Sequence, residues 1–207
     1  MKKTKDNMRS ISSDIISILK ISETVGWNDL SSMSIIRILY FSTLFYSFTH
    51  QKDNPFNREY NFIVTIRGPI SNDVSNSLAS LESDEKIKCK NLQYSLINEN
   101  IPSNLAEMPN YTKKNDWFMT VINILALYGE NKIYDLIFRD PEYKDKRDRN
   151  IKDITTNDSN ESLLFLNKFK KLFEETIDKE YASQLTPEKY LELYFDYIFS
   201  KVIKGEA

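Results

Sequence analysis

The chain contains very little of what common enzyme motifs require. Its 207 residues include only four glycines, one cysteine and one histidine. The glycines, at positions 26, 68, 129 and 205, are too far apart to form a phosphate-binding loop or a dinucleotide-binding turn. A single cysteine excludes an internal disulfide, and with a single histidine it leaves no recognisable zinc cluster or catalytic triad. We therefore expect no cofactor, no metal and no enzymatic activity in this chain.

Long apolar runs are also missing. The most apolar stretch, residues 34–48, is too short to cross a bilayer, and no secretory apolar segment follows the basic first residues. Hydrophobic residues make up 41% of the chain and charged residues 28%, with a net charge of -2. This balance is typical of a soluble globular protein and argues against a general nucleic-acid coat. We expect a cytoplasmic protein without a membrane partner, and the abundance of Ile, Asn and Lys suggests an AT-rich bacterial gene.

What the chain does contain is apolar residues at helical spacing. Ile11, Ile15, Ile18 and Leu19 predict a first amphipathic helix that ends near Gly26. Residues 34–48 are apolar on nearly every side, so they predict a central helix that other helices enclose. Within that helix Arg37 and Tyr46 would need hydrogen-bond partners if they are buried.

The second half of the chain continues the helical pattern. Residues 113–128 form an apolar stripe with Gly129 as a candidate C-terminal cap, and a shorter helix over 132–138 stops at Asp140-Pro141. We predict a mainly α fold with a small β hairpin, an α+β protein. Residues 1–140 would form a helical domain, 141–160 a charged linker or a solvated helix, and 161–207 a C-terminal helical hairpin.

Residues 60–97 have the order that a small winged-helix-like unit would need. A strand is predicted over 61–66, a break at Gly68-Pro69, and a helix capped by Ser71 with one apolar face. Two alternating runs within 87–96 then predict a hairpin about a Lys-Asn corner. We therefore predict a winged-helix-like unit at about 60–97 inside the helical domain.

That hairpin carries the candidate nucleic-acid contacts. Lys86, Lys88 and Lys90 would project from one strand face and could meet phosphates. A solvated strand face is the commoner explanation of such lysines. The candidate recognition helix and its end would repel DNA, because they carry no arginine and four acids, namely Asp73, Glu82, Asp84 and Glu85.

The C-terminal tail carries the candidate protein interface. An aromatic stripe at helical spacing predicts either an internal core or a surface that docks a partner, since each tyrosine combines apolar area with a polar tip. The residues chosen as interface candidates are Tyr190, Tyr194, Tyr197 and Ile198.

Three other residue groups could suggest catalysis. Asp135, Asp140, Glu142 and Lys144 include the E-x-K pattern seen at the end of metal-dependent nuclease motifs, but those sites lie on strand pairs whereas these residues follow a helix. His50 falls in a predicted polar loop and Cys89 in a predicted strand. Their simplest roles are a surface residue and a small buried residue.

A family resemblance rests on residues of the predicted winged-helix-like unit. The segments Tyr60-Asn61-Phe62 and Gly68-Pro69-Ile70-Ser71, followed by Leu78 and Leu81, resemble the Y-x-F, G-P-x-S, L-x-x-L layout of small bacterial accessory proteins. These are the middle components of three-component ABC-ATPase defence systems, including the Lamassu type. More distantly, residues 128–143 are similar in layout to the Panacea antitoxin domain.

The resemblance implies a non-enzymatic scaffold in an anti-phage complex. Such a subunit would bridge an ATPase related to structural-maintenance-of-chromosomes (SMC) proteins and a toxic effector, often a nuclease, and would help to control activation. DNA could be contacted within that complex, and ATP and metal would belong to the partners. The alternative is a winged-helix DNA-binding regulator or antitoxin that acts through the hairpin.

Overall fold

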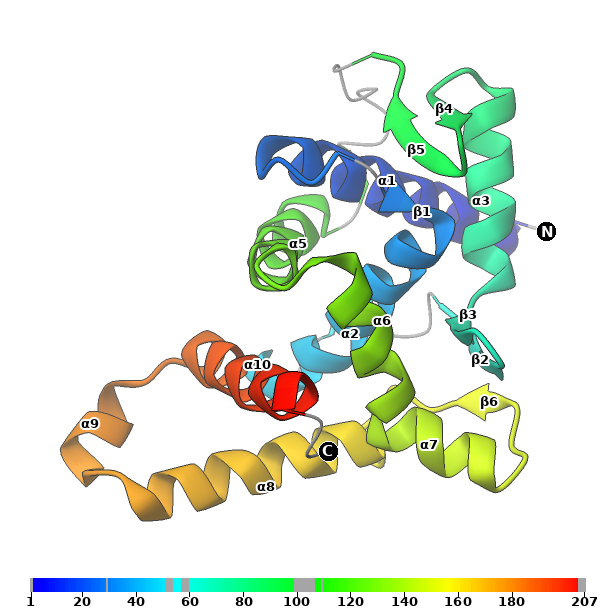
Figure 1. Cartoon of the computed structure of the whole chain (residues 1–207). Helices are drawn as coiled ribbons and strands as arrows, with labels where there is room; N and C mark the ends of the chain where they lie inside the picture. Colours follow the sequence, from blue (N-terminus) through cyan, green and yellow to red (C-terminus); the bar gives the residue numbers. More distant parts are fainter. Residues whose placement is uncertain are drawn as a thin grey trace.

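Helices dominate the computed structural model, which describes residues 2–28, 30–50, 54–56, 60–98, 107, 108 and 110–204. Two small antiparallel sheets of three strands each lie against the helices (Figure 1). The predicted mainly α, α+β fold is therefore confirmed. None of the helices in these ranges combines the length and the apolar character that crossing a bilayer requires.

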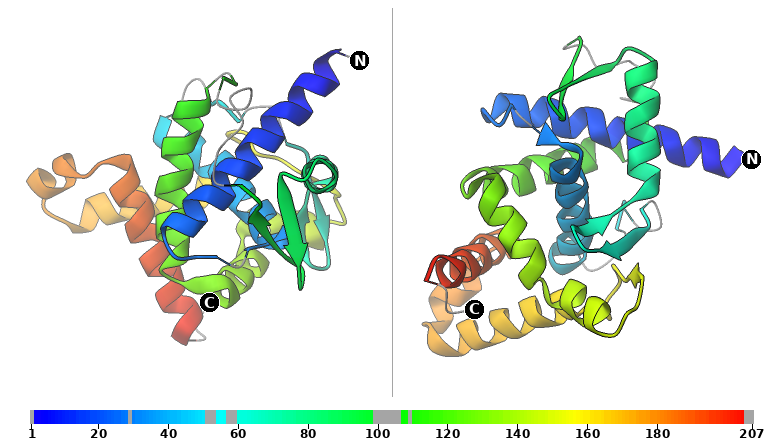
Figure 2. Two further views of the ribbon diagram at one scale, coloured as in Figure 1. Left: turned by 90° about the horizontal axis from the view of Figure 1, so that it is seen from above. Right: turned by 45° about the vertical axis from the view of Figure 1, so that its right-hand side comes forward.

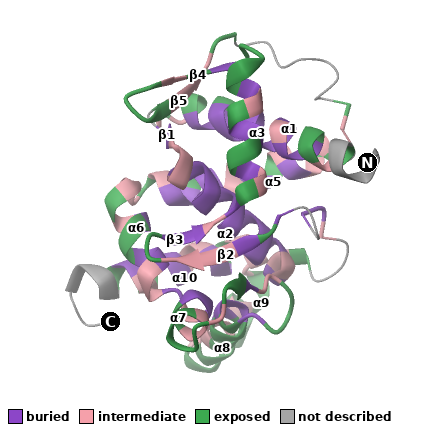
Figure 3. Cartoon of the chain, turned by 90° about the vertical axis from the view of Figure 1, so that its right-hand side faces the viewer, coloured by how far each residue is buried: buried purple, intermediate pink, exposed green. Residues whose placement is uncertain are grey.

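The central helix is α2, Ser32–His50, and almost its whole surface is buried, as its sequence predicts (Figure 3). Arg37 finds the partner that it needs, because its Nη1 donates to Oε1 of Glu130 at 2.9 Å. The hydroxyl of Tyr46 is buried and accepts or donates no hydrogen bond within the described ranges. Packing therefore holds Tyr46, whose ring lies edge-on to Trp117 with centroids 5.4 Å apart.

Helix α1, Lys2–Thr24, packs on α5, Tyr111–Ala126, around a buried ion pair. Nζ of Lys114 lies 2.8 Å from Oδ2 of Asp14, and both side chains are almost completely buried. Ser10 accepts a second hydrogen bond from Lys114, and the Tyr60 hydroxyl donates to Asp14. The predicted end of α1 is confirmed, since Gly26 has φ +81° and the Trp27 amide donates back to Ser22.

The predicted hairpin is confirmed as β4, Ile87–Lys90, and β5, Gln93–Leu96. Asn91 and Leu92 connect the strands with φ of 54° and 66°, the backbone of a two-residue hairpin turn. Strand β1, Leu30–Ser31, pairs with the other edge of β5 and was not predicted, because two residues show no alternation. The sheet order is thus β1-β5-β4, and it includes residues well before position 60.

The second sheet has the order β3-β2-β6 and corrects the prediction around Gly68. The expected strand is β2, Phe62–Thr65, but the chain turns at Ile66 and Arg67, and Gly68–Ile70 forms the edge strand β3. Proline is compatible with an edge strand, because its missing N–H faces no partner. Gly68 has φ +104°, and a Cβ there would lie 2.7 Å from Cγ2 of Ile137. The glycine therefore allows β3 to approach α6, Gly129–Arg139.

Helix α3, Asn72–Ser83, begins after Ser71 as predicted, but the serine side chain does not cap it. The Ser71 hydroxyl is buried without a partner among the described residues, while its carbonyl accepts from the amide and hydroxyl of Ser75. Gly129 also differs from its expected role. It has φ +76° and starts α6 directly after the two-residue turn that ends α5.

Residues 141–160 are folded: of the two predicted alternatives, a helix is present at their start and the charged linker is not. Helix α7 spans Pro141–Asp148, and β6, Asp153–Ile154, pairs with β2. Glu142 is fully buried and accepts hydrogen bonds from the amides of Thr155 and Glu161 at 3.1 and 2.9 Å. Apolar periodicity misses this segment because polar side chains bonded to backbone amides hold it in place.

The C-terminal helices are part of the same core. Helix α8 spans Glu161–Thr176, α9 spans Lys179–Gln184, and α10 spans Pro187–Lys204. The predicted pair of helices is present, but α10 packs on α2, α5 and α6 as well as on α8. Helix α9 lies at the edge of the molecule (Figures 1 and 2).

Candidate functional site

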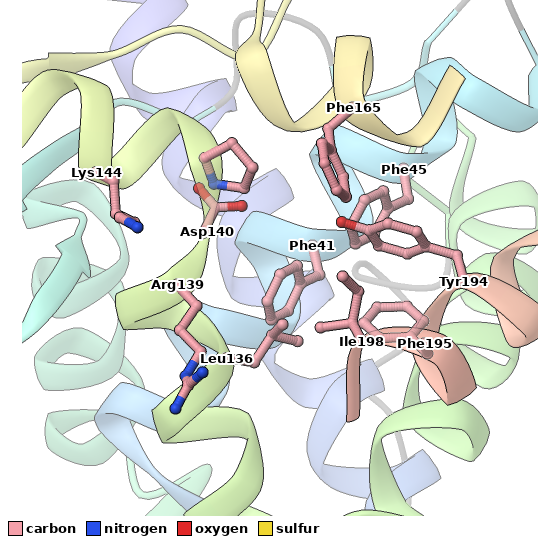
Figure 4. A pocket seen from close by; sticks show the side chains of 11 residues that line it. Phe41, Phe45, Leu136, Arg139, Asp140, Lys144, Phe165, Tyr194, Phe195 and Ile198 are labelled. Carbon is pink, nitrogen blue, oxygen red and sulfur yellow. The ribbon is translucent and has the colours of Figure 1, made fainter. Parts of the chain in front are cut away.

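A cavity lies where α2 meets the second half of the chain. It has a volume of about 530 Å³ and is lined by residues of α2, α6, α7, α8 and α10 (Figure 4). Cavities of about 300–1,000 Å³ with mostly apolar walls are the usual small-molecule sites of proteins. The lining residues, hereafter the pocket, are Phe41, Phe45, Leu136, Arg139, Asp140, Pro141, Lys144, Phe165, Tyr194, Phe195 and Ile198.

One wall of the pocket is aromatic. Phe41 and Phe45 lie one turn apart on α2, so their rings stack with centroids 5.5 Å apart. From α10, the Phe195 ring meets Phe45 edge-on at 5.4 Å. Phe165 of α8 completes the wall beside Tyr194, with centroids 6.3 Å apart. Edge-on and stacked contacts of this kind fix the ring positions and shape the apolar end of the pocket.

The opposite wall is polar because the chain breaks between α6 and α7. Asp140 ends α6 and caps α7, so Arg139 precedes it in α6 and Lys144 follows it in α7, and both lie on the side of Asp140 away from the aromatic rings (Figure 4). Asp140 is buried, and Oδ1 accepts from the Tyr40 hydroxyl and the Tyr143 amide, both at 2.9 Å. Oδ2 accepts from the Ser162 hydroxyl at 2.5 Å. The carboxyl group of Asp140 therefore joins α2, α7 and α8.

Burial dominates the electrostatics of this wall. It raises the pKa of the Asp140 carboxyl above its ordinary value, although the hydrogen bonds from Ser162, Tyr143 and Tyr40 oppose the shift. Burial and the nearby Asp140 together raise the pKa of Tyr40 well above that of an exposed tyrosine. Tyr40 is therefore a hydrogen-bond donor here and is not poised to act as a base.

Tyr194 connects the two walls. It is 3% exposed, and its hydroxyl points from the aromatic wall toward Asp140 (Figure 4). Burial, with a smaller contribution from Asp140, raises the pKa of Tyr194 far above its ordinary value, so the hydroxyl keeps its proton.

The nuclease-like residues do not converge. Asp135 is exposed on α6, whereas Asp140 and Glu142 are buried and bonded to backbone amides. In the ranges that the structure describes, no group of three His, Cys, Asp or Glu side chains could hold a metal ion. Of the four residues in the E-x-K hypothesis, only Asp140 and Lys144 line the same cavity.

The candidate lysines lie at the other end of the molecule. Lys86, Lys88 and Lys90 are exposed at the start of the hairpin and along β4, far from α8 and α10 (Figure 1). Their neighbours Glu82 and Asp84 are exposed as well. The predicted exposure is confirmed, and contact with nucleic acid remains a prediction.

The candidate interface residues divide into two kinds. Tyr190 and Tyr194 are only 2% and 3% exposed, so of the two predicted alternatives these residues belong to the internal core and not to an open interface. They face α8, where the Tyr190 hydroxyl donates to Glu174. Tyr197 is 42% exposed, and Ile198 is half-buried in the pocket. Helical spacing alone could not distinguish these sides, because both faces of α10 carry aromatic residues.

The structure adds an exposed apolar strip that the sequence interpretation missed. Phe165, Phe169 and Leu172 share one face of α8 at spacings of four and three residues. Phe165 is 40% exposed and Leu172 is 51% exposed. Tyr197 of α10 extends this α8–α10 strip, since its ring lies 5.4 Å from that of Phe169. The signal was present in the sequence as a second apolar face of α8.

The single histidine and the single cysteine both lie in regular secondary structure. His50 is the last residue of α2 and not part of a loop, and its ring stacks on Tyr46 with centroids 4.1 Å apart. Cys89 is half-buried in β4 opposite Tyr94.

Comparisons with known proteins do not extend this description. No protein-family model, no curated protein and no solved structure matches the chain.

Proposed function

We propose that this protein is a non-enzymatic accessory subunit that docks a partner protein through the α8–α10 strip. The observation that carries the proposal is the partial exposure of Phe165, Leu172 and Tyr197 beside one another on two packed helices. Exposed apolar strips of this kind favour protein contacts, because a partner removes their area from water. The occupant that fits a row at spacings of four and three residues is the apolar face of a partner's amphipathic helix.

The wider assignment comes from the sequence resemblance. We propose that the subunit works in the bacterial cytoplasm, within a Lamassu-like defence complex, between an SMC-like ATPase and a toxic nuclease effector. Partner contacts would hold the effector inactive until the ATPase responds to phage DNA. The strip supports the contact that this role needs, and the resemblance alone supplies the identity of the partners.

The test is native mass spectrometry of the chain expressed with its neighbouring genes. We expect a stable complex that contains a large ATPase and an effector. Replacing Leu172 with Glu should dissociate the complex, because it places a charge on the most exposed apolar residue of the strip. Leu164→Glu is the control, since Leu164 is similarly exposed at 49% on α8 but is not one of the strip residues. A lone monomer, or equal effects of the two substitutions, would contradict the proposal.

A DNA-binding regulator is the second candidate, favoured by the three exposed lysines. The elements α1, β1, α2, α3, β4 and β5, with β2 and β3 inserted between α2 and α3 and with β5 central in its sheet, support a winged-helix-like unit that starts at α1 and not at residue 60. The regulator should bind duplex DNA alone with a steep salt dependence. Changing Lys86, Lys88 and Lys90 together to Glu should abolish that binding. Unchanged DNA binding by the triple variant would exclude the hairpin as the contact.

A further inference from the structure

We propose that the pocket binds an uncharged, mainly apolar small molecule. The ligand would lie on the aromatic rings of α2 and α10 and would enter past the residues of α7, α8 and α10 that are open to solvent. The inference is independent of the proposed protein partner, because the purified chain alone should bind such a molecule.

The floor of the pocket is apolar and closed toward the core. Phe41, Phe45 and Phe195 are each 1% exposed, and their rings pack on one another with centroids 5.4 to 6.0 Å apart. Leu136 of α6 is also buried and lines the same cavity. A ligand on this floor would remove apolar area from water without first separating the packed rings.

The rim of the pocket is partly open, which gives a ligand access. Phe165 is 40% exposed, Ile198 is half-buried, and both line the cavity (Figure 4). The volume of about 530 Å³ lies within the range of small-molecule sites. Close-packed protein interiors leave few voids larger than a water molecule, so the packing of these helices does not by itself account for the cavity.

The charged side chains of the polar wall do not select an ion. Both oxygens of Asp140 already accept hydrogen bonds from groups of the fold. Arg139 already interacts within the chain, and Lys144 is exposed and lies beyond Asp140, away from the rings (Figure 4). An ion in the pocket would lose hydration without gaining a free opposite charge beside the rings, which is unfavourable. The lining therefore favours an uncharged ligand.

The experiment is fluorescence titration of the full chain with two dyes, N-phenyl-1-naphthylamine and 8-anilinonaphthalene-1-sulfonate. They share one ring skeleton and differ by the sulfonate group. We expect the uncharged dye to bind with a dissociation constant about tenfold or more below that of the sulfonate. Equal or tighter binding of the sulfonate would overturn the uncharged class of ligand. No binding of the uncharged dye up to its solubility limit would overturn the site.

A variant within the cavity tests the location of the dye. Ile198→Trp should weaken binding of the uncharged dye by about tenfold or more, because the indole ring fills the cavity. Tyr197→Trp is the matched control on the next residue of α10, which is 42% exposed and does not line the cavity. Circular dichroism checks that both variants are folded. If the dye binds folded Ile198→Trp as it binds the parent chain, the ligand does not occupy this cavity.

A second set of variants does not depend on the folding of Ile198→Trp. Phe165→Ala at the rim should weaken binding of the uncharged dye by roughly fivefold, whereas Leu164→Ala, at a similarly exposed position outside the cavity, should not change it. Because Phe165 also belongs to the α8–α10 strip, Leu172→Glu separates the two surfaces and should leave dye binding unchanged. A loss for Leu172→Glu as large as that for Phe165→Ala would place the dye on the strip and overturn the inference.

Discussion

At the residue scale, the buried pair of Asp14 and Lys114 is the most demanding interaction in the chain. Two charges removed from water are tolerated only while they compensate each other. Lys114→Met should therefore lower the free energy of unfolding by about 3–5 kcal/mol, measured by urea denaturation. Lys171→Met is the matched control on an exposed helix face and should change it by less than about 0.5 kcal/mol. A loss below about 1 kcal/mol for Lys114→Met would show that Asp14 finds another partner.

Asp140 predicts a pH dependence of stability. Its pKa is raised in the folded protein above the ordinary value of 3.8, so the folded state holds this proton to higher pH than the unfolded chain does. The stabilisation of the folded state by the protonated Asp140 carboxyl is complete at low pH. It is lost as pH rises from 3.8 through the pKa of Asp140 in the folded protein. The free energy of unfolding of the parent chain, relative to Asp140→Asn, should therefore decrease over that window and then stay constant. A difference that increases with pH would contradict the sign of the shift.

At the element scale, the turn of the β4–β5 hairpin is strained. Leu92 has φ 66° and is 81% exposed. Its backbone conformation is therefore unfavourable for a non-glycine residue, and burial of its side chain does not compensate. Leu92→Gly should raise the free energy of unfolding by about 1 kcal/mol, because an Asn-Gly pair suits this turn. Leu92→Ala keeps the strain and should change stability little. If both variants behave alike in chemical denaturation, the backbone conformation of the turn is not the cause.

The helices and the β4–β5 hairpin could be predicted from the sequence because their apolar spacing is regular. The spacing located α1, α2 and α10 and the hairpin corner at Asn91. It could not locate β1 or β6, because each has two residues and depends on pairing with a distant strand. Residues 141–160 were misread for a related reason, since Glu142 is buried through hydrogen bonds that no periodicity encodes.

The candidate site was only partly predictable. The aromatic residues of α10 were chosen from the sequence, but their spacing does not tell which ring faces α2 and which faces solvent. Phe41, Phe45 and Arg139 had no local signal of function, since each fits an ordinary helix. They form a pocket only because the break at Asp140-Pro141 brings α7 and α8 back over α2.

At the scale of the whole molecule, the C-terminal helices share one core with the rest of the chain. Phe195 is 1% exposed and packs on Phe41 and Phe45 of α2. Phe195→Ala should therefore lower the free energy of unfolding by about 3–5 kcal/mol. The unfolding transition followed by tryptophan fluorescence, which reports on the N-terminal part and α5, should shift together with the transition followed by far-UV circular dichroism. Tyr197→Ala is the control, with a loss of about 1 kcal/mol or less. Two separate transitions would show that the tail folds independently.

The position of α2 has a consequence for synthesis of the protein. This helix is apolar on nearly every side, yet α10, which covers its aromatic face, is translated more than a hundred residues later. At a translation rate of about 5–20 residues per second, this face of α2 stays without α10 for on the order of ten seconds while the chain is being synthesised. During that interval Phe41 and Phe45 are exposed to other nascent chains. Slower translation or a lack of ribosome-associated chaperones should therefore lower the yield of this protein before its equilibrium stability matters.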